Sequence, residues 1–335
     1  MNIKKETYFR TLSEGGVLDE RAVADLRARL ELHLRLDKVP EELLRRSNDQ
    51  HKITDYLTRL DPRVATGPKS WGGLVIGFPG SPRQLTTQTL GTPYLRKILY
   101  PALDLHQRLN AHYGRRLPCL YLLGARFPDV VLRKFRLLAQ VIPHLIVLTS
   151  DLLNAVSTPV PECSDSRTEQ FVQTRLCTIM QQEGLKVPVE GGELRLRYLA
   201  HELPTGEGTR EPERLDILAV DETDRSLVAF EIKGPHASRV ELENLFLQGL
   251  EHRDWLERNK MGVKLLVEGP KGTGINSKKR VRLVLGSFGT HVPDLFWALR
   301  RQAMRYDRYL QIDFVRFDRT DEGGKLVLSR PIEPT

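Results

Sequence analysis

The sequence lacks the features of several common protein classes. It contains only three cysteines, which are widely spaced and form no C-x-x-C pair: Cys119, Cys163 and Cys177. This spacing excludes a disulfide framework and a cysteine zinc site, so we expect isolated thiols. No apolar run approaches the ~18 residues that cross a bilayer, and the N-terminus has no apolar signal-peptide core. We therefore expect a cytoplasmic protein.

The composition also lacks the polar bias of a disordered chain. Hydrophobic residues make up 40% and charged residues 28% of the sequence, which is ordinary for a folded soluble protein. A length of 335 residues is enough for two domains.

Positive charge is concentrated in the first half of the chain. Residues 1–160 contain 24 Lys and Arg against 15 Asp and Glu, or +9, whereas residues 161–335 contain 27 against 28, or −1. A positive field of this size favours polyanions such as nucleic acid, although basic faces also serve solubility. Charge alone leaves both interpretations open.

Residues 1–156 are predicted to combine a helical segment with an α/β domain. Within residues 1–60, Val23, Leu26, Leu30 and Leu34 form one apolar helical stripe, and a second helix is expected over 41–60. Residues 61–156 alternate between short apolar runs and helical patterns. The expected strands are 73–78, 117–124 and 144–150, and the expected helices are 95–113, with a break at Pro101, and 128–142.

After a linker at 157–166, residues 167–330 are predicted to form a second α/β domain. Ser166 is expected to cap a helix that ends at Gly184. Three strands are expected at 193–200, 214–220 and 226–234, followed by a long helix over 239–259 and then a strand, a helix and a strand. This order predicts a small mixed sheet with helices on its faces.

Acidic and basic side chains interrupt two of these apolar strands, in the stretch RLDILAVDETDRSLVAFEIKG at 214–234. Alternation along a strand places Glu231 and Lys233 on one face, and pairing with the preceding strand brings Asp216 to the same end. Converging carboxylates favour a divalent cation such as Mg²⁺, with the Ile232 carbonyl as a further oxygen ligand. Lys233 would then orient a water molecule or stabilise charge on a phosphate, which predicts phosphodiester hydrolysis.

The pattern D-x(14)-E-x-K resembles the PD-(D/E)xK nuclease superfamily, whose members cut DNA, and less often RNA, with Mg²⁺ or Mn²⁺. The resemblance covers residues 165–320 and implies a restriction-endonuclease-like mixed sheet flanked by helices. It assigns Asp216, Glu231 and Lys233 to the catalytic motif, Glu169 to the helical glutamate that also serves the metal, and Gln248 to the glutamine on the following helix. Leu215 stands where the family name has proline. The nearest shapes are the Shedu-type defence nucleases and the mismatch endonucleases of archaea and actinobacteria.

The supporting residues have simpler explanations as well. Glu169 is also an ordinary first-turn glutamate favoured by the helix dipole, and Gln248 is also a solvated helix residue. Glu231 and Lys233 would form an edge-strand ion pair in a chance occurrence of the motif. Three histidines are expected at the surface or behind the site rather than as catalytic groups: His201, His236 and His252.

A basic insert lies between residues 258 and 282, with eight Lys and Arg against Glu268 alone, or +7. Four of these cations are predicted to contact phosphates near the metal site: Lys271, Lys278, Lys279 and Arg280. A solvated loop is the alternative.

The first half contains a faint copy of the second. Residues 74–82, 102–109 and 120–138 align in order with 227–235, 249–256 and 283–301. Glu231 then falls on Phe78 and Lys233 on Gly80. We therefore hypothesise that residues 60–155 form a degenerate nuclease-like half, retained for DNA holding or subunit contact.

Together these observations predict a metal-dependent nuclease acting on DNA, and the resemblance alone implies a setting in prokaryotic defence or repair. Cutting of two strands by a chain with one site favours a homo-oligomer. The alternative is a non-catalytic nucleic-acid-binding or scaffold subunit of a defence or mobile-element complex.

Overall fold

The computed structural model describes residues 37–38, 58–60, 73–77, 100–112, 119–123, 138, 145–148, 152, 155–156, 159–163, 168–205, 213–268, 274–288, 294–319 and 326–331. The chain divides into two compact units, Met1–Leu153 with Gly269–Lys271 and Asn154–Glu268 with Gly272–Thr335. Within the described ranges, no helix is long and apolar enough to cross a membrane.

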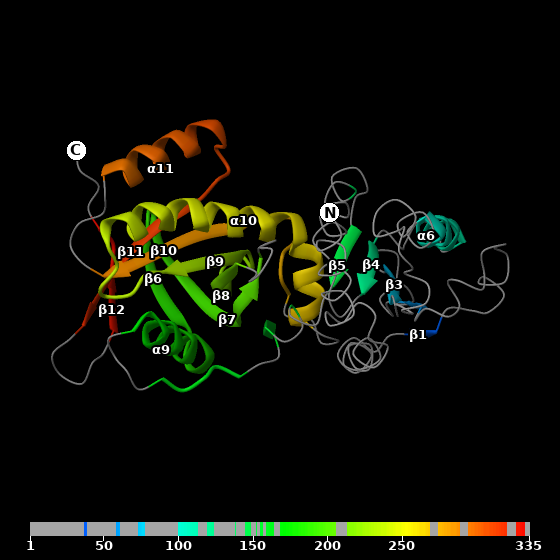
Figure 1. Ribbon diagram of the computed structural model, residues 1–335, viewed down its shortest axis with the longest axis horizontal. Coiled ribbons are helices and arrows are strands. Elements are labelled where there is room, and N and C mark those ends of the chain that lie inside the picture. The colour runs from blue at the N-terminus through cyan, green and yellow to red at the C-terminus, as the bar shows by residue number, and fades with distance from the viewer. Residues whose placement is uncertain are drawn as a thin grey trace, which may run out of the picture. The chain divides into compact units, whose positions relative to one another are not determined.

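The second unit is built on a seven-stranded mixed sheet (Figure 1). Its strands are β6 (Leu185–Val189), β7 (Gly192–Pro204), β8 (Arg214–Asp221), β9 (Leu227–Ile232), β10 (Arg282–Phe288), β11 (Ile312–Arg319) and β12 (Leu326–Ser329). They lie in the order β12-β11-β10-β9-β8-β7-β6. The central strands β9, β10 and β11 run parallel, and every other neighbouring pair is antiparallel.

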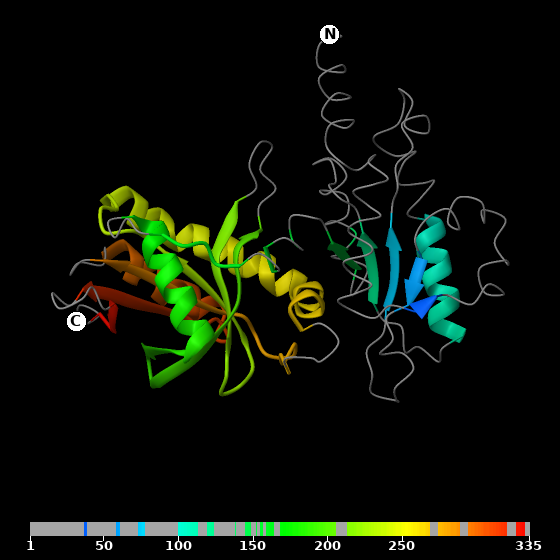
Figure 2. The same ribbon diagram turned by 90° about the horizontal axis from the view of Figure 1, so that it is seen from below.

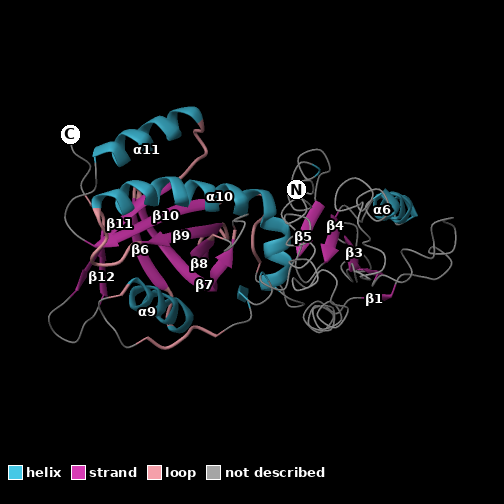
Figure 3. Ribbon diagram, in the orientation of Figure 1, coloured by secondary structure: helices cyan, strands magenta, loops and turns pink. Residues whose placement is uncertain are grey.

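Helices cover both faces of this sheet (Figure 3). Helix α9 (Glu169–Gln182) lies on one face, and α10 (Arg239–Glu268) and α11 (Asp294–Tyr306) lie on the other. Figure 2 shows the same layers from below, with α9 in front of the sheet. The predicted mixed sheet with helices on its faces is therefore confirmed.

Apolar side chains fill both interfaces between helices and sheet. On the α9 face, Val172, Leu176 and Met180 are buried among strand residues, at the spacing of one helical stripe. On the other face, Phe246 packs edge-on against Phe296 with ring centroids 5.1 Å apart. A Cβ on Gly249 would lie 2.6 Å from Leu285 Cδ2, so the absence of a side chain there lets α10 approach β10 closely.

The sequence pattern predicted helix α9 correctly but assigned its N-cap to the wrong residue. The Oγ1 of Thr168 accepts a hydrogen bond from Phe171 N at 3.2 Å, so the N-cap is Thr168 and the prediction of Ser166 is wrong. Gly184, with φ +77°, follows the last turn as predicted. Helix α10 continues to Glu268, nine residues beyond the expected end at Asn259.

The edge strands β6 and β12 were not predicted. Each is short, five and four residues respectively, and little alternation can be read in so few positions.

The first unit contains a five-stranded sheet in the order β1-β2-β3-β4-β5. Its elements are β1 (Asp37–Lys38), β2 (Thr58–Leu60), β3 (Gly73–Gly77), β4 (Cys119–Leu123), β5 (Leu145–Leu148) and the helix α6 (Tyr100–His112). The predicted strands at β3, β4 and β5 are confirmed. The predicted helix over 41–60 is wrong at its end, because β2 pairs there with β3. Pro101 is the second residue of α6, in the first turn, where proline is tolerated, and residues 95–99 of the predicted helix lie outside the described residues.

The two sheets share a topology. In the first, β1–β2 and β2–β3 are antiparallel, and β3–β4 and β4–β5 are parallel. The series β7, β8, β9, β10, β11 repeats these directions in the same order. Because β1 and most of β2 precede the residues 60–155 assigned to the degenerate copy, that hypothesis stays a prediction. The predicted counterparts of the motif, Phe78 and Gly80, lie outside the described residues, as do most of the predicted helices of residues 1–60.

Candidate active site

The strands β8 and β9 separate at the end that carries the acidic motif. Their last paired residues are Ile217 and Phe230. Asp216 lies one residue beyond this pair, and its Oδ2 accepts a hydrogen bond from the main-chain N of Ile232 at 2.7 Å. A side chain thus takes the place of a main-chain partner, and the predicted convergence of Asp216 with the Glu231 strand is found.

Glu231 is completely buried, and it lies close enough to Asp216 for each carboxyl group to shift the pKa of the other. Burial raises the pKa of Glu231 to about 8, with Asp216 contact and the Lys233 charge acting in the opposite direction. Burial also raises the pKa of Asp216, and the negative charge of Glu231 raises it further. Two such carboxyl groups are costly to ionise together, so the metal-free pair retains a proton unless a cation neutralises it.

Lys233 lies at the same strand end and connects the motif to α9. Its Nζ is 3.8 Å from Glu169 Oε1, and its side chain is 15% exposed. The other carboxylate oxygen of Glu169 accepts a hydrogen bond from Gly234 N at 3.0 Å. A Cβ on Gly234 would lie 3.1 Å from Glu169 N, so this close approach of α9 favours glycine. Glu169 therefore joins the site through Lys233 and Gly234.

Two polar residues that the sequence did not single out support Asp216 from the α9 side. Gln173, one turn after Glu169, donates from Nε2 to the main-chain oxygen of Asp216 at 2.8 Å and to Glu202 Oε1 at 2.7 Å. Glu202 has φ +51°, a left-handed conformation that is costly for a non-glycine residue and often marks functional sites. A glutamine in the buried stripe of α9 was the available signal for Gln173.

His252 of α10 lies directly behind Glu231. Its Nδ1 is 2.5 Å from Glu231 Oε1, and the imidazole is 1% exposed. Burial lowers the pKa of His252 and favours a neutral ring. On the opposite side, Nε2 is 3.9 Å from Glu213 Oε2.

The other proposed helix and histidine positions are placed differently. Gln248, one turn before His252, is bonded to none of the site residues within the described part of the chain. His201 is buried and shares a 2.6 Å hydrogen bond with the Tyr198 hydroxyl, whereas His236 is exposed. The sequence offered no means of selecting His252 from these three histidines.

Replacing His252 by alanine is expected to weaken Mg²⁺ binding by roughly 10- to 100-fold, the usual effect of removing a group that orients a metal ligand. Glu231 would lose the hydrogen bond to α10 that fixes the position of its Oε1. Calorimetric titration with Mg²⁺ measures the change, and His252→Gln should recover part of the affinity because its amide can still donate a hydrogen bond. Equal Mg²⁺ affinity in His252→Ala would show that Glu231 needs no such support.

The donor atoms at this site fit a magnesium ion. No group of three or more His, Cys, Asp or Glu residues with metal-binding geometry occurs within the described ranges. Asp216 and Glu231 nevertheless supply two carboxylates, and Glu231 Oε2 is buried with no hydrogen-bond partner. Protein-bound Mg²⁺ commonly uses one or two carboxylates and completes its shell with waters and substrate phosphate oxygens. The role of the Ile232 carbonyl stays a prediction.

The described cations that end the basic insert do not lie beside the carboxylates. Lys278, Lys279 and Arg280 precede the start of β10, whereas Glu231 pairs with Leu285, five residues after Arg280. Because β9 and β10 run parallel, these cations lie at the opposite end of the strands, and the predicted proximity to the metal site is wrong. Lys271 is outside the described residues.

No protein-family model matches this chain, and no curated protein or solved structure matches it.

Proposed function

We propose that this protein is a metal-dependent nuclease that hydrolyses phosphodiester bonds of DNA. The observation that carries the proposal is the pair of carboxylates, half-buried Asp216 and fully buried Glu231, next to Lys233 at the end where β8 and β9 separate. The pair has the charge and oxygen donors for a divalent cation, and the lysine supplies a fixed positive charge for a phosphate.

We further propose that the second unit has a restriction-endonuclease-like fold. Its mixed sheet has the motif on two adjacent antiparallel strands, and α9 brings Glu169 to the same end. This placement is what the PD-(D/E)xK resemblance implies. Defence or repair would be the biological setting, and a homo-oligomer would allow one-site chains to cut both strands.

In this proposal each side chain has a defined task. Asp216 and Glu231 would hold Mg²⁺ or Mn²⁺, which when bound polarises the phosphate and lowers the pKa of a bound water. Lys233, held near Glu169, donates hydrogen bonds to the oxygen on which negative charge develops. Gln173 fixes the main chain at Asp216, and His252 fixes the orientation of Glu231.

Purified protein is expected to cut plasmid or linear DNA when Mg²⁺ or Mn²⁺ is added, and the Lys233→Met variant should be slower by at least ~100-fold, as for loss of one charge-stabilising donor. Agarose gels of a time course measure the rate. Lys186→Met is the matched control, because Lys186 lies on edge strand β6 with a 64% exposed side chain. Equal cutting by Lys233→Met would remove Lys233 from the mechanism, and an inactive parent protein would favour a non-catalytic nucleic-acid-binding subunit.

A further inference from the structure

Two segments meet at the end of the sheet opposite the carboxylate pair. Residues 274–281 lead into β10, and residues 307–311 lead into the parallel strand β11. Leu283 pairs with Ile312, and Leu283 N donates to the main-chain oxygen of Gln311 at 3.0 Å. Arg280 and Tyr309 each lie three residues before this pair. The two segments are therefore neighbours. Together with Arg305 and Tyr306 at the end of α11, we call them the strand-entrance surface.

This surface has an excess of positive charge. Its exposed cations are Lys278, Lys279, Arg280, Arg305 and Arg308. Asp307 is the single acidic residue of this surface. Two acidic residues next to this surface each form ion pairs with two cations. Asp224 lies within 4 Å of Lys279 and Arg282. Glu257 contacts Lys260 and Arg280. Positive charge thus remains for a polyanion.

Two exposed tyrosines accompany these cations. Tyr306 is 85% exposed and Tyr309 is 57% exposed. The guanidinium of Arg308 lies 4.9 Å from the Tyr309 ring centroid and donates to the tyrosine hydroxyl at 2.7 Å. Exposed aromatic rings and arginine planes provide surfaces on which unpaired bases stack.

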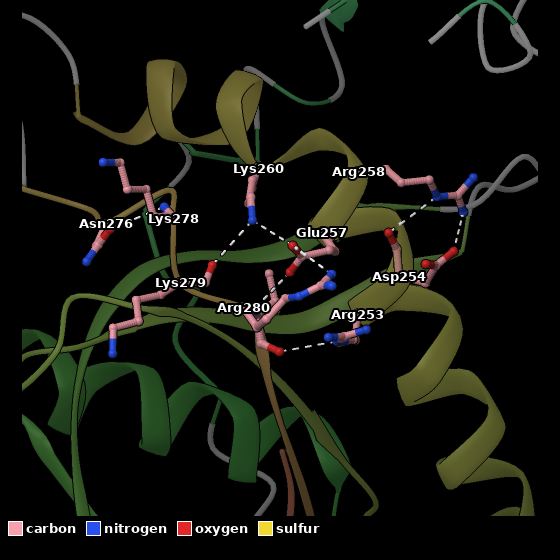
Figure 4. A network of polar contacts seen from close by, with 10 residues as sticks. Arg253, Asp254, Glu257, Arg258, Lys260, Asn276, Lys278, Lys279 and Arg280 are labelled. Carbon is pink, nitrogen blue, oxygen red and sulfur yellow. Dashed lines mark hydrogen bonds and ion pairs between the residues drawn. The ribbon is translucent and has the colours of Figure 1, made fainter. Parts of the chain in front are cut away.

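Hydrogen bonds hold the basic segment in place (Figure 4). Glu257 Oε2 accepts from Val281 N at 2.8 Å, and Lys264 Nζ donates to Ile275 O at 2.6 Å. Asn276 N donates to the main-chain oxygen of Arg225 at 2.8 Å. Lys278 and Lys279 extend away from Glu257, whereas Arg280 points toward it. The segment is therefore an ordered support for its lysines, which a freely solvated loop would not provide.

We propose that the strand-entrance surface binds a single-stranded segment of nucleic acid, separately from the cleavage site. Phosphates would contact the lysines and arginines, and bases would stack on the tyrosines. Arg280 and Leu285, the partner of Glu231, are five residues apart, roughly 16 Å at about 3.3 Å per residue. A strand several nucleotides long is needed to reach both places. The inference takes from the proposed function only that the ligand is a nucleic acid.

Binding is tested with a fluorescent oligothymidine of about 16 nucleotides, a length at the upper end of single-strand sites. The protein carries Asp216→Asn and is measured in EDTA, so that no cleavage occurs. Adding Lys278→Glu and Lys279→Glu should weaken binding at least ~10-fold. The slope of log affinity against log salt concentration should fall by the amount expected for about two lost phosphate contacts. Adding Tyr306→Ala instead should weaken binding about 5-fold or more with an unchanged salt dependence.

The charge-matched control is Arg175→Glu with Lys186→Glu, on α9 and β6, and it should keep most of the affinity. Equal losses in the control and the test variant would indicate general electrostatics and overturn the proposal. Unchanged binding by the test variants would also overturn it, as would tighter binding of duplex than of single strands. Because these readings need neither metal nor cleavage, they stand if the parent protein proves inactive. A failed binding test likewise leaves the cleavage assay valid.

Discussion

Replacing Asp216 by asparagine is expected to abolish DNA cleavage without destabilising the fold. The substitution removes one of the two carboxylates that we propose as metal ligands, and several kcal/mol of transition-state charge stabilisation correspond to a fall of about 1000-fold or more in rate. The asparagine Oδ1 can still accept the hydrogen bond from Ile232 N. The substitution also removes a carboxyl group whose ionisation is opposed by burial and by the charge of Glu231, so the metal-free variant should unfold at the same temperature as the parent or above it.

Lost cleavage together with unchanged stability would distinguish a catalytic carboxylate from a structural one. Cleavage is measured on linear DNA with Mg²⁺ or Mn²⁺, and unfolding is followed by circular dichroism in EDTA. Glu222→Gln is the matched control, because Glu222 is an exposed carboxylate in the turn after β8, where it contacts Arg197 at 4.0 Å. The control should cut DNA at the parent rate. A large loss of stability in Asp216→Asn would instead mean that its carboxylate serves the fold.

The metal-free protein is expected to lose stability as pH rises from about 6.5 to about 8. The pKa of Glu231 is raised from 4.5 to about 8, so in this range the unfolded chain has released the proton that the folded protein still binds. Stability then falls by up to about 1.4 kcal/mol per pH unit. Asp216 acts in the same direction, because its pKa is also raised. Below about pH 6.5 the lowered pKa values of His201 and His252 act in the opposite direction, which fixes the lower limit of the range.

Urea unfolding in EDTA at the two pH values measures this slope, and Glu231→Gln should flatten it because the glutamine cannot titrate. Added Mg²⁺ should reverse the slope in the parent protein, since the ion binds the deprotonated pair and stabilises the folded state. The variant should respond weakly to Mg²⁺. Parallel slopes in the parent and Glu231→Gln would show that Glu231 ionises normally in the folded protein.

Local patterns in the sequence were sufficient to locate the elements that carry the site. Strands β8 and β9 were expected because apolar residues dominate 214–220 and 226–234, and the structure has them at Arg214–Asp221 and Leu227–Ile232. Alternation then placed Glu231 and Lys233 on one face. These predictions depend on neighbours within a few residues, which the sequence displays directly.

Contacts between distant parts of the chain could not be predicted in this way. His252 meets Glu231 across 21 residues, and Gln173 meets the Asp216 main chain across 43. Each contact depends on which face of the helix is turned toward the sheet when the two pack together. One turn of α10 separates the expected Gln248 from the observed His252, and only the packing of Phe246 and Gly249 against their neighbours determines which residue faces Glu231.

The sequence by itself determined the mixed α/β class of the second unit, its principal strands and the residues of the acidic motif, because spacing and side-chain chemistry act over short distances. The tertiary structure decided which groups surround that motif and where the basic insert lies. Parallel pairing of β9 with β10 places Lys278–Arg280 at the end of the strands opposite Glu231. Strand direction is a property of the assembled sheet, set by burial on both faces, and no single strand encodes it.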